Sequence, residues 1–384
     1  MRVCYAPNLR FKEFEGEWEM CKVSDLLDFY STNSLSWDKL EYGTDAIQNL
    51  HYGLIHVELP TMVDLCKDNL PNIVNGNTPK NYELCKEGDI AFADASEDTN
   101  EVAKAIEFYN LNGKDVICGL HTIHGRDNQQ KTVVGYKGYA FSSTAFLHQI
   151  RRIAQGTKIY SINSKNFSEC YIGIPSKGEQ KKIATLLRLI DERIATQNKA
   201  IDKLQSLIKG IAQNVVRNHK PNTRLSDCLE CYSSTLQESD VCEYGTYPVY
   251  GANGIVGYLD SYNTDGEAVY IIKDGSGVGT VSYVTGKCSA TGTLNTLQAK
   301  EGYSLQYLYY MLKVFNFEPY KTGMAIPHIY FKDYSKAKIF CPQYTEQLKY
   351  VRLLSAIDNK LSAEQNILTN FSLQKQYLLR QMFI

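Results

Sequence analysis

The sequence contains an internal repeat at a fixed offset of 167 residues, and this repeat constrains the fold more than any other feature. Eight of the seventeen residues from Pro175 to Asp191 recur, without a gap, between Pro342 and Asp358. Identity at a fixed period indicates a duplicated structural unit. We therefore expect two globular regions, 1–174 and 219–341, each followed by a more constant tail, 175–218 and 342–384. The match extends upstream of the tails, where the aligned residues are Gly156, Ile159, Ile162 and Lys165, and Gly323, Ile326, Ile329 and Lys332.

Each tail has the pattern of a long helix. Ser176 and Glu179 have the spacing of a capping box, and Pro175 lies just before it. Beyond this start, apolar residues recur in alternating steps of four and three, which is the 3.5-residue period of a coiled coil. Gln197 and Glu364 interrupt the two stripes at equivalent positions. The seam residues that we expect are Ile183, Leu187, Ile190, Ile194, Ile201, Leu204, Ile208 and Ile211 in the first tail, and Leu354, Ile357, Leu361, Leu368, Phe371 and Leu378 in the second.

Two such stripes are too long for either globular region to cover, because helices of roughly 40 residues span about 60 Å. We therefore expect the helices to pack on each other as an antiparallel pair. The polar breaks in the stripes either set the register of the pair or mark a solvated, locally frayed place.

The globular regions are expected to be mixed and rich in β-structure. Short apolar runs bounded by turns begin at Gly88, Asp115 and Ala268, and helical spacing begins at Ser304. The predicted fold class is thus α+β, with two β-rich mixed domains separated by long antiparallel helices in an internal pseudo-two-fold repeat.

Composition and charge narrow the class of protein. Hydrophobic residues make up 43% and charged residues 22% of 384 residues, as in soluble globular proteins. No apolar signal sequence or run of about 18 apolar residues is present. Eleven cysteines without such a signal favour reduced thiols and a cytoplasmic location. The net charge is −1, but residues 1–174 hold 17 basic and 23 acidic side chains, whereas residues 175–220 hold 10 and 4.

The sequence offers little support for a catalytic or metal site. None of the ten prolines forms a Pro-Pro pair, which excludes the Asn/Asp-Pro-Pro-Tyr/Phe motif of adenine-N6 methyltransferases. The run from Gly275 to Gly279 fits a tight hairpin better than a dinucleotide-binding loop. Two groups of candidate metal ligands have no fourth ligand at the spacing found in zinc fingers, so no metal is expected. They are Cys228, Cys231 and Cys242, and His121 with His124.

The layout resembles the specificity subunit of type I DNA restriction–modification enzymes over essentially the whole chain. The residues that carry the resemblance in the first half are PNLRFKEFEGEWE from Pro7, AIQNLHYG from Ala46, GDIAFADASED from Gly88, GLHTI from Gly119, QGTKIYSI from Gln155 and IPSKGEQKKIA from Ile174. In the second half they are YPVYGANGIVGY from Tyr247, KDGSGVG from Lys273, GMAIPHI from Gly323 and LLRQMF from Leu378. Their order, together with the duplication and the paired heptads, makes the resemblance specific.

The resemblance implies a non-catalytic subunit that reads a split sequence in double-stranded DNA, one half per recognition domain. The helices would set the spacing and dock two methyltransferase subunits, and through them restriction–translocase subunits. It implies no cofactor on this chain; S-adenosylmethionine, ATP and Mg²⁺ would belong to the partners. Because the globular regions are acidic, the partners would supply much of the phosphate neutralisation. A coiled-coil scaffold without DNA readout is the alternative that the low net charge favours.

Candidate DNA contacts are polar side chains expected in short loops, where Asn and Gln suit adenine and Arg and Lys suit guanine. Ordinary turn chemistry explains any one of these side chains equally well. In the first half they are Thr44, Gln48, Asn49, His51 and Tyr52 in one loop, and Gln155, Thr157 and Lys158 in another. In the second half they are Tyr250, Asn253, Lys273 and Ser276, followed by Lys321 and Thr322.

Overall fold

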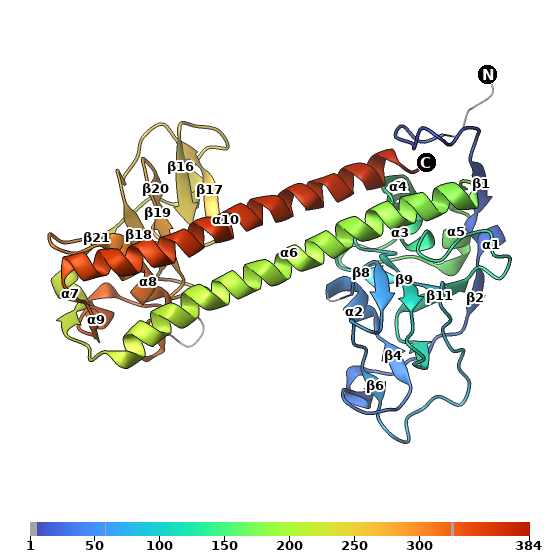
Figure 1. The fold of residues 1–384 in the computed structure, drawn as a ribbon, viewed down its shortest axis with the longest axis horizontal. Coiled ribbons are helices and arrows are strands. Elements are labelled where there is room, and N and C mark those ends of the chain that lie inside the picture. The colour runs from blue at the N-terminus through green and yellow to red at the C-terminus, as the bar shows by residue number, and fades with distance from the viewer. Residues whose placement is uncertain (1–5, 58, 324–325) are drawn as a thin grey trace. The chain divides into compact units, whose positions relative to one another are not determined.

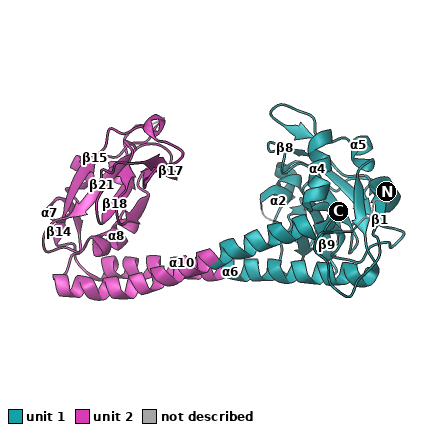
Figure 2. Ribbon diagram, turned by 90° about the horizontal axis from the view of Figure 1, so that it is seen from above, with its two compact units in different colours: residues 1–197, 367–384 teal, residues 198–366 magenta. Residues whose placement is uncertain are grey.

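The computed structural model describes residues 6–57, 59–323 and 326–384, which fold into two compact units. Unit 1 comprises Met1–Gln197 and Ile367–Ile384, and unit 2 comprises Asn198–Asn366 (Figure 2). The helices α6 (Lys177–Asn218) and α10 (Tyr344–Gln381) each contribute residues to both units. In the described part of the chain, no helix has the length and apolar character needed to cross a membrane.

Unit 1 is built on short strands (Figure 1). They are β1 (Glu19–Lys22), β2 (Asp28–Tyr30), β3 (Leu40–Glu41), β4 (Gln48–Leu50), β5 (Met62–Asp64), β6 (Asn72–Ile73), β7 (Ile90–Ala93), β8 (Ala95–Ser96), β9 (Ala105–Asn110), β10 (Val116–Cys118), β11 (Thr122–Arg126), β12 (Tyr160–Ser161) and β13 (Tyr171–Ile174). The larger sheets have the orders β2-β11-β7-β9-β5 and β10-β4-β6-β3, and the pairs β1-β13 and β12-β8 stand apart. The pairs β5-β9 and β4-β10 are parallel and the other pairs are antiparallel.

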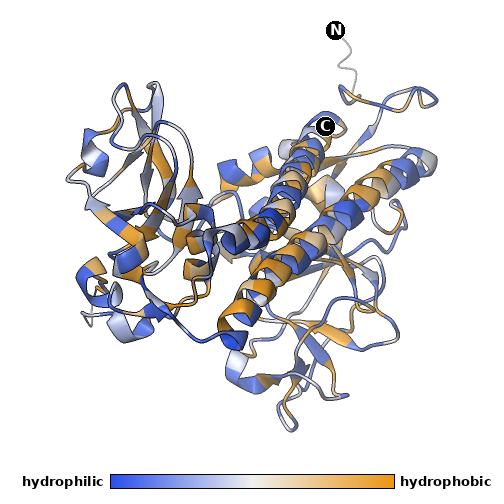
Figure 3. Cartoon of the chain, turned by 60° about the vertical axis from the view of Figure 1, so that its left-hand side comes forward, coloured by the Kyte–Doolittle hydropathy of each residue, from blue (hydrophilic) through white to orange (hydrophobic). Residues whose placement is uncertain are grey.

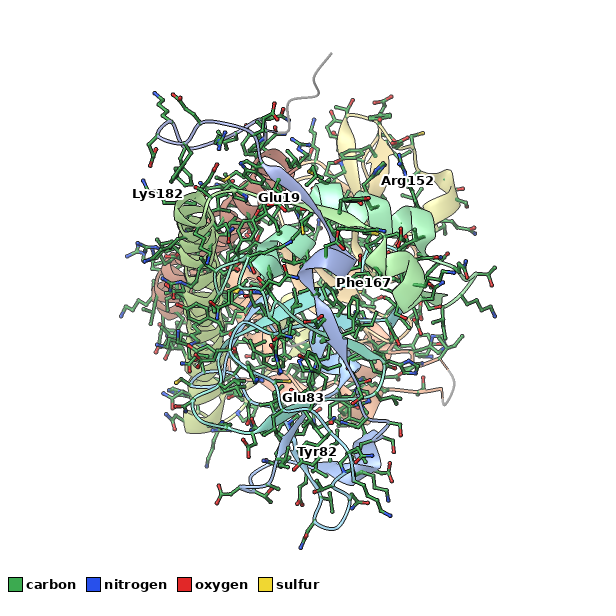
Figure 4. All side chains as sticks on the ribbon, turned by 90° about the vertical axis from the view of Figure 1, so that its right-hand side faces the viewer. Glu19, Tyr82, Glu83, Arg152, Phe167 and Lys182 are labelled. Atoms are coloured by element: carbon green, nitrogen blue, oxygen red, sulfur yellow. The ribbon has the colours of Figure 1, made fainter. Side chains whose placement is uncertain are left out.

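Helices cover the five-stranded sheet of unit 1 and complete its core. Every residue of β7 is buried, as expected for a strand that is covered on both faces. Phe92 of β7 packs edge-on against Phe141 and Phe167, with ring centroids 4.9 and 4.7 Å apart (Figure 4 labels Phe167). The short helices are α1 (Val23–Leu26), α2 (Tyr52–Val57), α3 (Lys137–Phe141), α4 (Thr144–Ile153) and α5 (Ser164–Ser168), with a 3₁₀ turn η1 (Trp37–Lys39).

Unit 2 has fewer strands and one long local helix. Its strands are β14 (Thr223–Arg224), β15 (Leu229–Ser233), β16 (Tyr247–Gly251), β17 (Gly254–Leu259), β18 (Ala268–Ile272), β19 (Val281–Val284), β20 (Ser289–Ala290), β21 (Leu294–Ala299) and β22 (Lys338–Ile339). They form sheets in the orders β15-β21-β18-β19, β17-β16-β20 and β14-β22. The helices are α7 (Leu225–Cys228), α8 (Leu305–Lys313) and α9 (Phe331–Tyr334), with the 3₁₀ turns η2 (Glu238–Asp240) and η3 (Glu318–Tyr320); α8 packs on β18, β19 and β21.

The strands and the local helix expected from the sequence are confirmed in both units. The apolar runs from Gly88 and Asp115 contain β7 and β8, and β10 and β11. The run from Ala268 contains β18 and β19, which pair across the glycine-rich turn. The helical spacing from Ser304 is α8, whose N-cap Ser304 side chain accepts a hydrogen bond from the Tyr307 backbone N–H.

The two long helices begin close to the expected positions, but the capping box before α6 is only half formed. Ser176 Oγ accepts a hydrogen bond from the Glu179 backbone N–H at 3.4 Å. The Glu179 carboxylate does not return to the cap. It is buried and accepts two hydrogen bonds from the Arg10 guanidinium, each 2.7 Å long. The Glu179 carboxylate binds Arg10 instead of the cap N–H because a bidentate hydrogen-bonded pair with a guanidinium is stronger than a hydrogen bond from a neutral N–H.

The apolar stripes of both helices face away from solvent. All fourteen expected seam residues are buried or half-buried, and apolar residues recur between polar ones along each helix in Figure 3. Within unit 1, Ile183, Leu187 and Ile190 of α6 share one core cluster with Leu378 of α10 and Phe383. The Lys375 ammonium forms an ion pair with Asp191 at 2.6 Å.

Candidate nucleic-acid interface

The first group of expected DNA contacts does not lie in a single loop. Thr44 is exposed in a bend, but Gln48 and Asn49 belong to the buried strand β4. Gln48 Nε2 donates to the Leu70 carbonyl, and Asn49 Oδ1 accepts from Asn33 Nδ2 at 2.7 Å. The expectation of one exposed loop is wrong because the short run from Gln48 to Leu50 pairs with β6 and β10 at the centre of a sheet.

His51 and Tyr52 follow β4 and form part of a row of rings. The ring of His51 lies 4.5 Å from that of Trp37 and 4.8 Å from that of Tyr52. The Tyr52 ring in turn lies 5.2 Å from the ring of His121. His51 is buried, and burial together with the nearby His121 lowers the pKa of His51, which keeps its ring neutral. Trp37 is 46% exposed, so the row has an open end at which a flat, apolar group could stack.

Gln155, Thr157 and Lys158 are exposed in a turn that two reciprocal backbone hydrogen bonds close. Gln155 N–H donates to the Ser161 carbonyl, and Ser161 N–H donates to the Gln155 carbonyl. Gly156 has a φ of +137°, and a Cβ there would lie 1.9 Å from the Ile159 carbonyl oxygen. The turn therefore requires glycine at this position.

Backbone contacts tie this turn to the row of rings. Strand β12, at the end of the turn, pairs with β8, and Ile162 N–H donates to the Asp94 carbonyl. The Asp94 carboxylate lies 3.2 Å from Nδ1 of His121, at the far end of the row. The structure thus connects the second group of first-half candidates to Tyr52 of the first group, whereas Gln48, Asn49 and His51 are buried. Trp37, His121 and Asp94 were not predicted as part of this region, because only the fold places Trp37 beside His51, His121 beside Tyr52 and Asp94 beside His121.

Unit 2 contains a similar turn between Thr322 and His328. Reciprocal backbone hydrogen bonds join these two residues, and the exposed Thr322 stands at its start. Gly323 has a φ of +87°, and a Cβ there would lie 2.3 Å from the Ile326 carbonyl oxygen. Lys321 precedes the turn and forms an ion pair with Glu318 at 2.6 Å.

Of the remaining second-half candidates, Lys273 and Ser276 lie next to this turn, whereas Tyr250 and Asn253 belong to the β16–β17 hairpin. Ile329 N–H donates to the Lys273 carbonyl, and Gly275 N–H donates to the Pro327 carbonyl, so Lys273 and the exposed Ser276 lie next to the turn. His328 Nδ1 lies 2.6 Å from the Asp274 carboxylate. Tyr250 is half-buried in β16, and Asn253 is exposed in the turn between β16 and β17. The Tyr250 carbonyl accepts a hydrogen bond from the Thr291 N–H, and the Thr293 carbonyl accepts one from the Lys273 N–H. The hydroxyl oxygens of Thr291 and Thr293 lie 2.8 Å apart.

The metal candidates considered from the sequence do not assemble in the described part of the chain. Cys228 is buried whereas Cys242 is exposed, and neither belongs to a group of ligands close enough to share an ion. His121 and His124 point to different carboxylates, Asp94 and Asp89. His124 instead lies beside two cysteines from other parts of the sequence.

Comparisons with known proteins agree with the layout of the two units. The family model described as the type I restriction modification DNA specificity domain matches twice, over residues 66–206 and 223–370. The EcoprrI type I restriction enzyme specificity subunit of Escherichia coli is 28% identical over 112 residues, which are 29% of this chain and 28% of that protein. A putative type I specificity subunit of Haemophilus influenzae, S.HindORF215P, is 29% identical over 116 residues, or 29% of this chain and 30% of that protein. The matched region thus spans less than a third of the length of either relative.

Solved structures extend the likeness to the whole fold. The S subunit of a type I restriction–modification system from M. genitalium has a TM-score of 0.65 at 16% identity, and 99% of each chain is covered. A chain from a study of complex assembly and conformational transition of the type I R-M system has a TM-score of 0.54 at 14% identity, covering 94% of this chain and 96% of that one. At these identities the likeness concerns the fold alone. Because the family model accounts for well over half of the residues in two successive matches, the chain belongs to the family of type I restriction modification DNA specificity domains.

Proposed function

We propose that this chain is the DNA sequence-specificity subunit of a type I restriction–modification complex, and that each unit reads one half of a bipartite target. The observation that carries the proposal is the pair of closed turns, one in each unit, that the 167-residue offset relates. Gln155 and Ser161 become Thr322 and His328 when 167 is added, and both pairs make the same two backbone bonds. A reader of two half-sites needs two such surfaces, as a palindromic operator needs a dimer.

We propose that the repeat seen in the sequence is also a repeat of structure, because further contacts in the two units are related by the same offset of 167 residues. Gln180 and Gln347 are both buried, and each donates through Nε2 to the carbonyl of the proline five residues before it. Ile162 and Ile329, also 167 residues apart, donate to the chain just after β7 and β18. These contacts support the proposal that the backbone of each closed turn, and the start of each long helix, are held in the same way in the two units.

Direct base or phosphate contacts are assigned to the exposed candidates, because a buried amide cannot reach a groove. This set comprises Thr44, Gln155, Thr157, Lys158, Asn253, Ser276 and Thr322, with the half-buried Tyr52, Tyr250, Lys273 and Lys321 beside them. Gln48, Asn49 and His51 are assigned a positioning role under the surface. Lys158 suits a phosphate or a guanine edge, and Gln155 suits adenine.

The long helices are proposed to form an antiparallel pair that spaces the two readers. The contact in unit 1 between the first part of α6 and the last part of α10, including the pair Lys375–Asp191, supports this direction. Both helices also keep large apolar side chains exposed, among them Leu189 at 49% and Leu373 at 56%. Exposed apolar residues on a helix suit a protein partner, and we assign these faces to two methyltransferase subunits. Those partners would carry S-adenosylmethionine, and the translocase subunits bound through them would use ATP and Mg²⁺.

A domain exchange tests the proposal. Residues 23–160 are replaced by the equivalent region of a relative with a different target, and the methylated motif is read by sequencing the genome of cells that express the complex. One half of the motif should change while the other half and the spacer stay the same. The matched control exchanges residues 225–327, which should change only the other half.

Two outcomes contradict the proposal. If either exchange alters both halves of the motif, the units do not read separately. If the complex assembles but no DNA is retained in a gel shift with or without the methyltransferase, the chain is a coiled-coil scaffold, the alternative favoured by its net charge of −1.

A further inference from the structure

Three side chains with metal-binding atoms converge in the interior of unit 1. Cys85 precedes β7, Cys118 ends β10 and His124 lies in β11. One ligand atom from each lies within 4.8 Å of the others, and the two sulfur atoms are 3.6 Å apart. The side chains are 6%, 2% and 0% exposed, respectively. They come from both larger sheets, because β10 belongs to one and β11 to the other.

His124 is oriented as a metal ligand would be. Its Nε2 lies 2.8 Å from Oδ2 of Asp89, and Asp89 is fixed in turn by two bonds from the Arg126 guanidinium. A carboxylate that holds one ring nitrogen of histidine and leaves the other for a cation is the usual arrangement around protein-bound zinc. The second nitrogen, Nδ1, is buried and has no hydrogen-bond partner. A buried nitrogen without a partner is costly and calls for a ligand.

The spacing of the sulfur atoms fits a shared cation. Two thiolates on a tetrahedral zinc ion, each about 2.3 Å from it, lie roughly 3.8 Å from each other. The separation of 3.6 Å between Cys85 and Cys118 is close to that value. A disulfide between the two cysteines is the competing explanation, but it would leave Nδ1 of His124 without a partner. A cation accounts for all three groups.

We propose that Cys85, Cys118 and His124 bind one zinc ion through their two Sγ atoms and Nδ1. Both thiols lose their protons to solvent on binding, so two thiolates neutralise the dication and the histidine contributes its lone pair. No fourth Cys, His, Asp or Glu belongs to this group among the described residues, so water completes the coordination. Unit 2 offers no group of three ligands in its described residues, so the ion is specific to unit 1.

The ion would fix the two larger sheets of unit 1 to each other, next to the strand that leads into the row of rings. Asn33 Nδ2 donates both to the Cys118 carbonyl and to Asn49 Oδ1, and Gly119 N–H donates to the Leu50 carbonyl. Strand β4 is therefore hydrogen-bonded to the segment that contains the ligand Cys118, and the residues that directly follow β4 belong to the row of rings. The role is structural, and it does not depend on the proposed DNA function.

Metal analysis of the full chain, purified under reducing conditions, tests the site. Elemental mass spectrometry should find about one zinc per chain. After removal by a chelator, cobalt(II) should give thiolate charge-transfer bands and the visible d–d bands of a tetrahedral site. Zinc should also raise the unfolding temperature reported by tryptophan fluorescence, because both tryptophans, Trp18 and Trp37, lie in unit 1.

Substitutions then locate the ion. Cys85→Ser and Cys118→Ser should each weaken zinc binding at least tenfold and lower the intensity of the cobalt thiolate charge-transfer bands. Cys170→Ser removes another buried thiol of unit 1 and should leave both unchanged.

The wild-type titration stands even if a cysteine variant fails to fold. Absence of zinc and of a cobalt spectrum in the folded wild type overturns the proposal. So does a Cys85–Cys118 disulfide in folded, metal-free protein, or an equal loss of binding in Cys170→Ser. None of these measurements uses DNA or a methyltransferase, so they succeed or fail separately from the proposed function.

Discussion

The buried glutamine at the start of α6 gives a sharp test of how the helix is anchored. Gln180 is 0% exposed and makes three hydrogen bonds. Its Oε1 accepts from the Val133 N–H at 2.8 Å, and its Nε2 donates to the carbonyls of Lys131 and Pro175. The substitution Gln180→Leu keeps the volume roughly constant and removes all three bonds, so its cost reports polar contacts rather than a cavity.

The expected loss of stability in Gln180→Leu follows from the burial of the Gln180 side chain. Each lost hydrogen bond costs about 1 kcal/mol, and the part-buried Val133 N–H left without a partner adds about 1–3 kcal/mol. The free energy of unfolding of unit 1 should therefore fall by about 4–6 kcal/mol. For a unit of roughly 200 residues this lowers the unfolding temperature by about 8–24 °C.

Gln149→Leu is the matched control. Gln149 makes two hydrogen bonds of 2.9 Å to the backbone of Tyr171, but these lie at the surface, where water replaces them. We expect a loss of about 1 kcal/mol or less. Thermal unfolding followed by tryptophan fluorescence compares the variants in unit 1. Equal losses for the two variants would refute the reasoning, because burial would then not decide the cost.

Two further predictions concern the readers and their spacing. Gly156→Ala and Gly323→Ala each place a Cβ within 2.3 Å of a carbonyl oxygen, so each should distort one closed turn and lower the methylation rate at the target at least tenfold. Gly76→Ala is the control for backbone strain alone, because Gly76 has a φ of +84° and open space around it. Four residues inserted after both Gln197 and Glu364 add about 6 Å of helix. Because base pairs stack roughly every 3.4 Å, the spacer in the methylated motif should grow by one or two base pairs, and an unchanged spacer in an active complex would show that the helices do not set the distance.

The long helices could be predicted because their information is local and periodic. A 3.5-residue stripe depends only on neighbouring residues, and the expected seam positions are indeed shielded from solvent. The capping box before α6 was half wrong for the opposite reason. Arg10 lies 169 positions from Glu179, and no local pattern shows that it captures the carboxylate.

The candidate site was predictable only in part, since it is assembled from distant segments. Short loops were predicted at Gln155 and at Thr322, but the sequence did not predict that reciprocal backbone hydrogen bonds close them. The burial of Gln48 and Asn49 was missed, because a polar strand of three residues looks like a loop in the sequence. The convergence of Cys85 and Cys118 on His124 was missed as well, because the spacing of their positions resembles no metal motif and only the meeting of two sheets joins them.

The two copies of the repeat differ in a way that bears on function. The copies share the contacts that hold the backbone, such as those of Gln180 and Gln347. Glu179 and Glu346 are also identical in type, yet the first is buried against Arg10 and the second is exposed. At the start of the closed turns the backbone bonds are the same while the exposed side chains differ, Gln155 in one unit and Thr322 in the other. Identical backbone frames that present different polar side chains are what two readers of unlike half-sites require, because the frame fixes where a side chain meets the groove and the side chain decides which base it accepts.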